Sequence, residues 1–146
     1  MNRLLQQLDP EEMATVFYGT IHPGDLTFRF SSAGHMSPII REPDGTVRIR
    51  KMEGGPPLGA PSGWSFTDDL EQLHPGTSIV LFTDGVIERR DASLDDGFLW
   101  LSELCRAELS PEERCDAIVD QLTAKGDLDD DVAVLVVEVV ADPNGP

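Results

Sequence analysis

The chain has 146 residues, 40% of them hydrophobic, which is enough for one domain with a buried core. Its 27 acidic and 11 basic residues give a formal net charge of -16, which repels the phosphate backbone of nucleic acids. No apolar stretch approaches the roughly 20 residues that span a bilayer, and the N-terminus lacks the apolar segment and cleavage site of a signal peptide. These features argue against a nucleic-acid-binding or membrane-spanning protein, and we expect a cytoplasmic one.

The first half of the chain predicts antiparallel strands joined by short turns. Residues 2–8 are typical of the end of a helix. β-Branched and aromatic residues, together with turn residues between them, predict strands over residues 14–21, 26–32, 38–40 and 46–52. In the second of these strands apolar and polar residues alternate, which indicates a sheet with one solvent-exposed face.

The second half adds strands, two helices and a last strand. A loop with four glycines and three prolines, residues 53–63, leads to strands near 64–70 and at 78–83. A helix is expected over about 96–108, and a second follows Ser110, with Pro111 in its first position and Glu113 three residues after the cap. Its apolar residues Cys115, Ile118, Val119 and Leu122 follow a helical period.

The C-terminal region reads as a buried strand and a frayed tail. The density of valine and leucine over residues 132–140 predicts a central strand, and residues 141–146 are expected to be flexible. A long meander, two helices and a terminal strand make the fold α+β rather than alternating βαβ.

The chain contains two cysteines, Cys105 and Cys115, which are ten residues apart and lack metal-site spacing. A disulfide and two free thiols are both compatible with this spacing. The cytoplasmic expectation favours free thiols.

Two acidic clusters flank the most hydrophobic predicted strands. Asp84 ends the strand over residues 78–83, and Asp129, Asp130 and Asp131 precede the strand that starts at Val132. If these strands are antiparallel neighbours, both clusters lie at the same rim of the sheet. Carboxylates without accompanying histidine or cysteine suit Mg²⁺ or Mn²⁺. From the residues alone, a turn at Asp84-Gly85 and a solvated acidic loop are more frequent interpretations than a metal site.

Four motifs, in order and at suitable spacing, change this balance. They are Ala33-Gly34-His35, Pro57-Leu58-Gly59, Thr83-Asp84-Gly85-Val86 and Asp130-Asp131-Val132. With them, residues 1–140 resemble a partial domain of the PPM-type metal-dependent protein phosphatases, and of the SpoIIE-like bacterial serine phosphatases in particular.

The resemblance implies an antiparallel β-sandwich with flanking helices and two Mn²⁺ or Mg²⁺ ions at one end. In this family a metal-activated water hydrolyses phosphoserine or phosphothreonine, and the implied substrate is a phosphorylated regulator of the anti-sigma-factor-antagonist type. By motif matching, Asp84 and Asp130 are the catalytic metal ligands. Gly85, Asp131 and His35 would support the site, with Gly85 allowing the chain to turn close to the metals.

The resemblance also implies that the domain is incomplete at its N-terminus, because the motifs that supply the family's other metal-ligating aspartates have no match here. Unpaired sheet edges should then promote self-association. An alternative function is therefore a non-catalytic regulatory or fragment module of the same fold with an incomplete metal centre. A simple acidic cation-binding β domain would explain the charge but not the ordered motifs.

Overall fold

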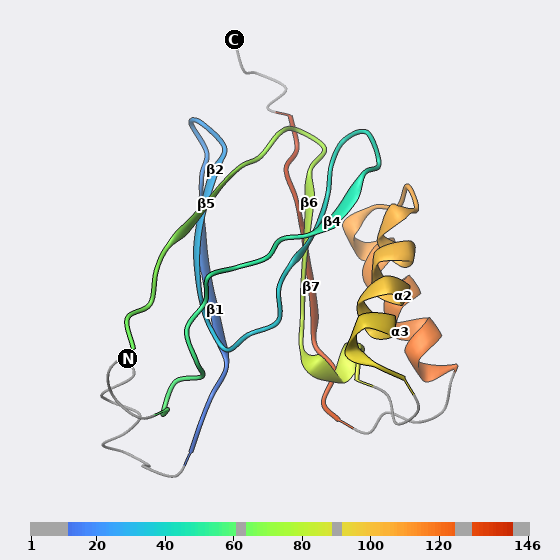
Figure 1. Cartoon of the computed structure of the whole chain (residues 1–146). Helices are drawn as coiled ribbons and strands as arrows, with labels where there is room; N and C mark the ends of the chain where they lie inside the picture. The colour runs from blue at the N-terminus through green and yellow to red at the C-terminus, as the bar shows by residue number, and fades with distance from the viewer. Residues whose placement is uncertain (1–11, 61–63, 89–91, 125–129, 142–146) are drawn as a thin grey trace. The chain divides into compact units, whose positions relative to one another are not determined.

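The computed structural model describes residues 12–60, 64–88, 92–124 and 130–141. They form two compact units, one built from segments before His35 and between Lys51 and Leu73, and the other from Met36–Arg50 and the chain from His74 onward. Each unit contains one antiparallel sheet, and both helices belong to the second unit (Figure 1). The predicted helix over residues 2–8 lies outside the described residues.

The first unit is a three-stranded sheet in the order β1-β2-β5. Its strands are β1 (Val16–His22), β2 (Thr27–Ala33) and β5 (Asp69–Gln72). The alternation predicted for β2 is confirmed, because Phe28 and Phe30 are buried whereas Arg29 is exposed. The rings of Phe28 and Phe30 stack with their centroids 4.7 Å apart, and Phe17 of β1 stacks on Phe30 at 5.5 Å. Aromatic side chains therefore form the buried face of this sheet.

The second unit is a four-stranded sheet in the order β4-β3-β6-β7, packed against two helices. Its strands are β3 (Ile39–Arg41), β4 (Val47–Ile49), β6 (Ser78–Phe82) and β7 (Val134–Glu138). Four residues of β6 are buried, as its continuous apolar run predicts. Ile39, Val80 and Phe82 of the sheet join Leu101, Cys105 and Ile118 of the helices in one hydrophobic core.

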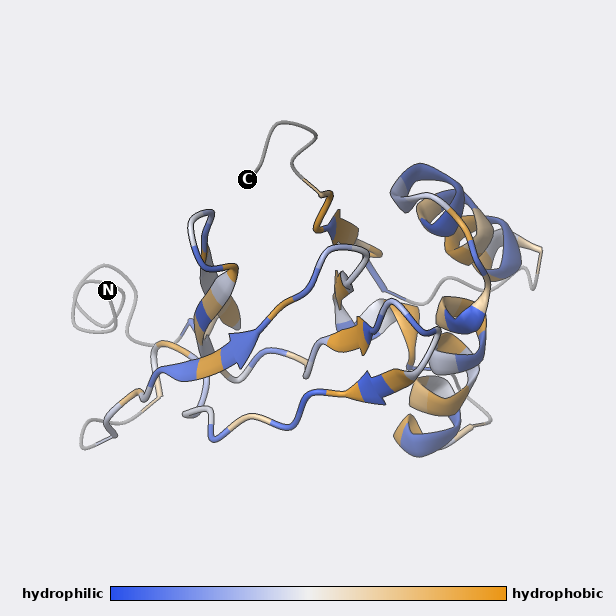
Figure 2. Cartoon of the chain, turned by 90° about the horizontal axis from the view of Figure 1, so that it is seen from above, coloured by the Kyte–Doolittle hydropathy of each residue, from blue (hydrophilic) through white to orange (hydrophobic). Residues whose placement is uncertain are grey.

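One helix starts as the sequence predicts, at Pro111 after Ser110, whereas the other starts at Leu94, two residues before the expected position. Helix α2 (Leu94–Arg106) has Ser93 as N-cap, and helix α3 (Pro111–Thr123) has Ser110, each with a complete capping box. Hydrophobic and hydrophilic residues occupy different sides of these helices (Figure 2). Both cysteines are free thiols, and burial raises the pKa of Cys105 to about 11.

Three predictions need correction. The strand expected near residues 64–70 forms later, at Asp69–Gln72. Helix α3 buries Arg114, Ile118 and Leu122, whereas Val119 is 42% exposed, so its buried face is rotated from the predicted one. Strand β7 is not central among the described strands, because it pairs with β6 alone and forms an edge of the sheet.

Neither α-helix in the described part of the chain has the length and apolar composition needed to cross a membrane.

Candidate metal centre

The two acidic clusters converge at one rim of the second sheet. Strands β6 and β7 are antiparallel neighbours, with Phe82 opposite Val134. The end of β6 therefore lies beside the start of β7, as the metal-site hypothesis required. Asp84 opens a short 3₁₀ turn (η1, Asp84–Val86) directly after β6, and Asp130 and Asp131 lie just before β7.

Thr83 holds the two segments together through three hydrogen bonds. Its backbone N–H donates to the carbonyl of Ala133 at 3.1 Å. Its hydroxyl donates to the carbonyl of Asp131 at 3.0 Å and accepts from the N–H of Ala133 at 2.9 Å. This side chain extends the ladder by one step beyond the strands, at the point where the aspartates begin.

Gly85 lies against the backbone of the second cluster. A Cβ atom at this position would be 2.7 Å from the carbonyl oxygen of Asp131 and 3.3 Å from the carbonyl carbon of Asp130. The distance of 2.7 Å is too short for a real Cβ contact and that of 3.3 Å is tight, so any other residue would push the turn away from these aspartates. The close approach that the structure shows at Gly85 is to the backbone of this partner segment, and the predicted approach to the metals stays a prediction.

The side chains of Asp84 and Asp130 are oriented in the same way. Oδ1 of Asp84 accepts from the N–H of Gly85 at 3.1 Å, and Oδ1 of Asp130 accepts from the N–H of Asp131 at 2.7 Å. The second oxygen of each carboxylate makes no further hydrogen bond to a described residue. Asp84 is half-buried, while Asp130 and Asp131 are exposed. Within the described ranges, each carboxylate is therefore held through one oxygen only.

This arrangement fits a hard divalent cation in its chemistry, because it supplies carboxylate oxygens on a rigid mount and a close approach that only glycine permits. Within the described ranges, no three side chains of histidine, cysteine, aspartate or glutamate form a ligand cluster. Asp129, the first residue of the acidic run, lies outside those ranges.

His35 belongs to the other unit and is bonded there. Its backbone N–H donates to the hydroxyl of Ser32 at 3.2 Å, and its Nδ1 lies 3.4 Å from the hydroxyl of Thr15. The ring of His35 also packs against Phe17, with centroids 6.1 Å apart. These contacts place His35 in the packing at the end of β2.

The other two motifs also meet, within the first unit. The N–H of Gly34 donates to the carbonyl of Gly55 at 2.8 Å, and a Cβ on Gly34 would be 2.6 Å from Cγ of Pro57. Gly34 has a φ of 68°, in the left-handed region that favours glycine. Motifs far apart in the sequence thus form two contacts, one in each unit.

Sequence reasoning missed the hydrogen bonds of Thr83, and it missed that Gly97 of helix α2 lies against Ile87, where a Cβ on Gly97 would be 2.8 Å from Cβ of Ile87. The signal for Thr83 was its hydroxyl directly before the aspartate. The signal for Gly97 was a glycine inside a predicted helix, which is unfavourable unless the backbone must approach another segment closely.

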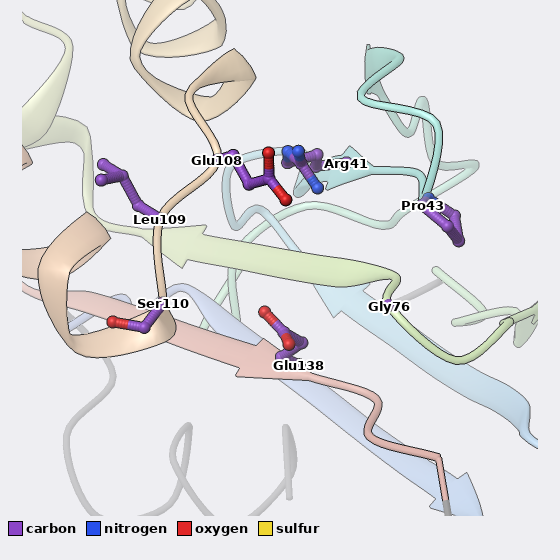
Figure 3. Close-up of a pocket in the computed structure, with 7 residues that line it drawn as sticks. All are labelled: Arg41, Pro43, Gly76, Glu108, Leu109, Ser110 and Glu138. Atoms are coloured by element: carbon purple, nitrogen blue, oxygen red, sulfur yellow. The ribbon is translucent and has the colours of Figure 1, made fainter.

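A pocket of about 340 Å³ lies at the opposite end of the β6–β7 pair (Figure 3). Its lining comprises Arg41, Pro43, Gly76, Glu108, Leu109, Ser110 and Glu138. The side chains of Arg41 and Glu108 point toward one another in Figure 3. Nε of Arg41 is buried and has no hydrogen-bond partner among the described residues. None of the predicted site residues lines this pocket.

Solved structures define the class of the fold. The structure of the RsbU and RsbW domains of Rv1364c from Mycobacterium tuberculosis is 25% identical to this chain, with a TM-score of 0.83. The match covers 97% of this chain and 41% of the Rv1364c chain. The phosphatase domain of SpoIIE from Bacillus subtilis is 18% identical, with a TM-score of 0.70, over 99% of this chain and 65% of that one. The predicted α+β, PPM phosphatase-like fold is thereby confirmed.

A family model described as stage II sporulation protein E (SpoIIE) matches residues 1–140, so the chain belongs to the SpoIIE family. Protein IcfG from Synechocystis is 30% identical over 82 residues, which are 56% of this chain and 13% of that protein. This chain thus spans less than two thirds of the length of these relatives. Related structures include a manganese-presoaked SpoIIE phosphatase domain and RsbX in complex with magnesium.

Proposed function

We propose that this chain carries part of a protein serine/threonine phosphatase site that hydrolyses phosphoserine or phosphothreonine on a regulatory protein of the anti-sigma-factor-antagonist type. The observation that supports this most strongly is the contact of Gly85 with the backbone of Asp130 and Asp131, because it brings the two acidic motifs of the family together. Family membership and the phosphatase structures with the same fold support the reaction class.

In this proposal Asp84 and Asp130 are the catalytic residues that hold Mn²⁺ or Mg²⁺, two ions in a complete domain. When bound, such ions lower the pKa of a water molecule and neutralise negative charge on the phosphoryl oxygens. Asp84 and Asp130 would offer their open carboxylate oxygens, and the amides of Gly85 and Asp131 would orient those carboxylates. His35 would support the fold of its own unit.

The proposal is tested by titrating Mn²⁺ calorimetrically into the purified chain and into its Asp84→Asn and Asp130→Asn variants. Each substitution replaces one carboxylate oxygen by an amide nitrogen and removes one charge. We expect binding by the unsubstituted chain and at least about a tenfold loss of affinity in each variant, because one oxygen ligand and its charge are removed. Phosphate release from a phosphoserine-containing regulator should fall in parallel.

Asp116→Asn is the matched control, because Asp116 is exposed on helix α3 and the substitution removes the same charge. It should leave Mn²⁺ affinity unchanged. Equal losses in all three variants would reduce the effect to net charge and contradict a specific site. Absence of Mn²⁺ binding would favour the non-catalytic regulatory or fragment module.

We also propose that the chain associates with a second copy of itself along β7. Among the described strands β7 pairs on one side only. Two antiparallel copies of β7 centred on Val136 would place Glu138 opposite Val134 of the other copy, so that no like charges meet.

We further propose that the chain acts in the cytoplasm. Its two free thiols support a reducing compartment.

A further inference from the structure

The turn that carries Asp84 is built on a small number of hydrogen bonds. The carbonyl of Asp84 accepts from the N–H groups of Ile87 and Glu88, both at 2.8 Å, and the carbonyl of Thr83 accepts from the N–H of Val86 at 3.0 Å. Val86 and Ile87 are fully buried. The direction of the Asp84 side chain thus depends on where the backbone from Phe82 to Ile87 is held.

Helix α2 holds the far end of this turn through Gly97. A Cβ on Gly97 would be 2.8 Å from Cβ of Ile87 and 3.0 Å from its carbonyl carbon, and the carbonyl oxygen of Ile87 would be closer still. The first turns of the helix therefore lie directly on the backbone of Ile87. Alanine is the better helix former, so a glycine here is not explained by helix stability. It is explained by this contact.

Phe98, the next residue of helix α2, contacts the segment that carries Asp84 at its other end, at Phe82. The ring of Phe98 meets the ring of Phe82 edge to face, with centroids 5.8 Å apart and planes at 73°. Phe82 is the last residue of β6, two positions before Asp84. Two consecutive residues of α2 thus contact the two ends of the segment that contains Asp84.

We propose that Gly97 and Phe98 are positioning residues, which set the direction of the Asp84 carboxylate through the backbone contacts of helix α2. The part of this inference that concerns metal rests on the proposed function. The part that concerns the turn does not, because it follows from the packing alone. A displacement of α2 by one extra methyl group would be transmitted to Ile87 and from there to the hydrogen bonds on the Asp84 carbonyl.

Amide hydrogen exchange in the metal-free chain tests the packing. Gly97→Ala should accelerate exchange of the Val86, Ile87 and Glu88 amides by about tenfold or more, because the added Cβ overlaps the turn. Phe98→Leu keeps an apolar side chain and should produce a smaller acceleration at the same amides. The Leu81 amide, within the β6–β7 ladder, should keep its protection and report that each variant is folded.

Leu99→Ala is the matched control, because Leu99 belongs to the same helix and is 60% exposed. It should leave the exchange rates of all these amides unchanged. If Gly97→Ala does not fold, Phe98→Leu alone decides the question. The inference would be overturned if the folded variants exchange the turn amides at unchanged rates. Equal acceleration at the Leu81 amide would also overturn it, since Gly97 and Phe98 would then stabilise the whole unit rather than the turn.

Mn²⁺ titration of the same proteins tests the link to the site. Gly97→Ala should weaken Mn²⁺ binding at least about tenfold, and Leu99→Ala should not, since misdirected carboxylates coordinate poorly. Faster turn exchange with unchanged affinity would overturn the positioning role toward metal. If the unsubstituted chain binds no Mn²⁺, the proposed metal site fails, while the exchange data still decide whether α2 positions Asp84.

Discussion

Arg114 is the least expected buried residue in this chain. It is 1% exposed, although charged residues are almost never fully buried unless they are paired. Its guanidinium donates to the carbonyls of Cys105 at 2.7 Å, Ala107 at 3.1 Å and Leu109 at 3.1 Å. These carbonyls lie at the end of α2 and in the link to α3, so one side chain satisfies acceptors that the helix end leaves open. Burial lowers the pKa of Arg114, and nearby Arg41 acts in the same direction.

Arg114→Met should destabilise the second unit strongly. Methionine retains an apolar stem of similar length, but it leaves the three carbonyls without a donor. We expect a loss of about 2–4 kcal/mol in the free energy of unfolding, measured by urea denaturation.

Arg106→Met provides the comparison, because Arg106 forms an exposed ion pair with Glu103 on α2. Exposed pairs contribute little, so this change should cost about 0.5 kcal/mol or less. A similar small cost for Arg114→Met would show that water replaces the guanidinium at these carbonyls.

At the scale of elements, the helix starts are encoded locally and the strand positions are not. The hydroxyl of Ser110 accepts from the N–H of Glu113, while the Glu113 carboxylate accepts from the N–H of Ser110 at 2.9 Å. These contacts involve residues three positions apart, which is why sequence alone predicts them. The hydrogen bonds from the backbone and hydroxyl of Ser110 lower the pKa of Glu113.

Ser110→Ala should destabilise the chain by about 1 kcal/mol at neutral pH, as expected for loss of an N-cap. The effect should depend on pH, with a sign fixed by the lowered pKa of Glu113. The stabilisation that comes from the ionised Glu113 carboxylate is fully present above its ordinary pKa of 4.5. It is lost as the pH falls through the lower pKa that Glu113 has in the folded chain.

Thermal unfolding of both proteins from pH 6 to pH 3 checks this expectation. The difference in melting temperature between the unsubstituted chain and Ser110→Ala should shrink at low pH. It should not vanish, because in the unsubstituted chain the Ser110 hydroxyl still accepts from the Glu113 N–H. A constant difference over this range would contradict a role for the carboxylate in the cap.

At the scale of the whole molecule, the edge that β7 forms among the described strands and the net charge act in opposite directions. Val139 donates to the carbonyl of Thr77, and Thr83 donates to that of Ala133, so odd-numbered residues of β7 bond to β6. The N–H groups of Val134, Val136 and Glu138 therefore point away from β6. They can pair with a second copy, whereas a net charge of -16 on each chain opposes association.

Val136→Pro should abolish the proposed self-association while preserving the β6–β7 ladder, because the N–H that it removes points away from β6. Light scattering coupled to size exclusion, at tens of micromolar protein, measures the mass. Added salt should increase the associated fraction of the unsubstituted chain by screening its charge.

Leu135→Ser is the companion variant, because Leu135 is 55% exposed and its backbone bonds to β6. Loss of association in this variant alone would place the contact on the face of the sheet rather than at its edge. A monodisperse monomer for the unsubstituted chain would contradict association altogether.

The sequence by itself determined most of the strands and helices, the capping box at Ser110 and the pairing of Asp84 with the acidic run, because each depends on local patterning or on the ordered motifs of the family. Tertiary structure alone decided that Arg114 rather than Val119 is buried, and that β7 is an edge among the described strands. It also decided that Gly85 and Gly97 lie against backbone. The physical reason is that a residue's local pattern sets which element it joins, whereas its burial and close contacts depend on segments far away in the chain.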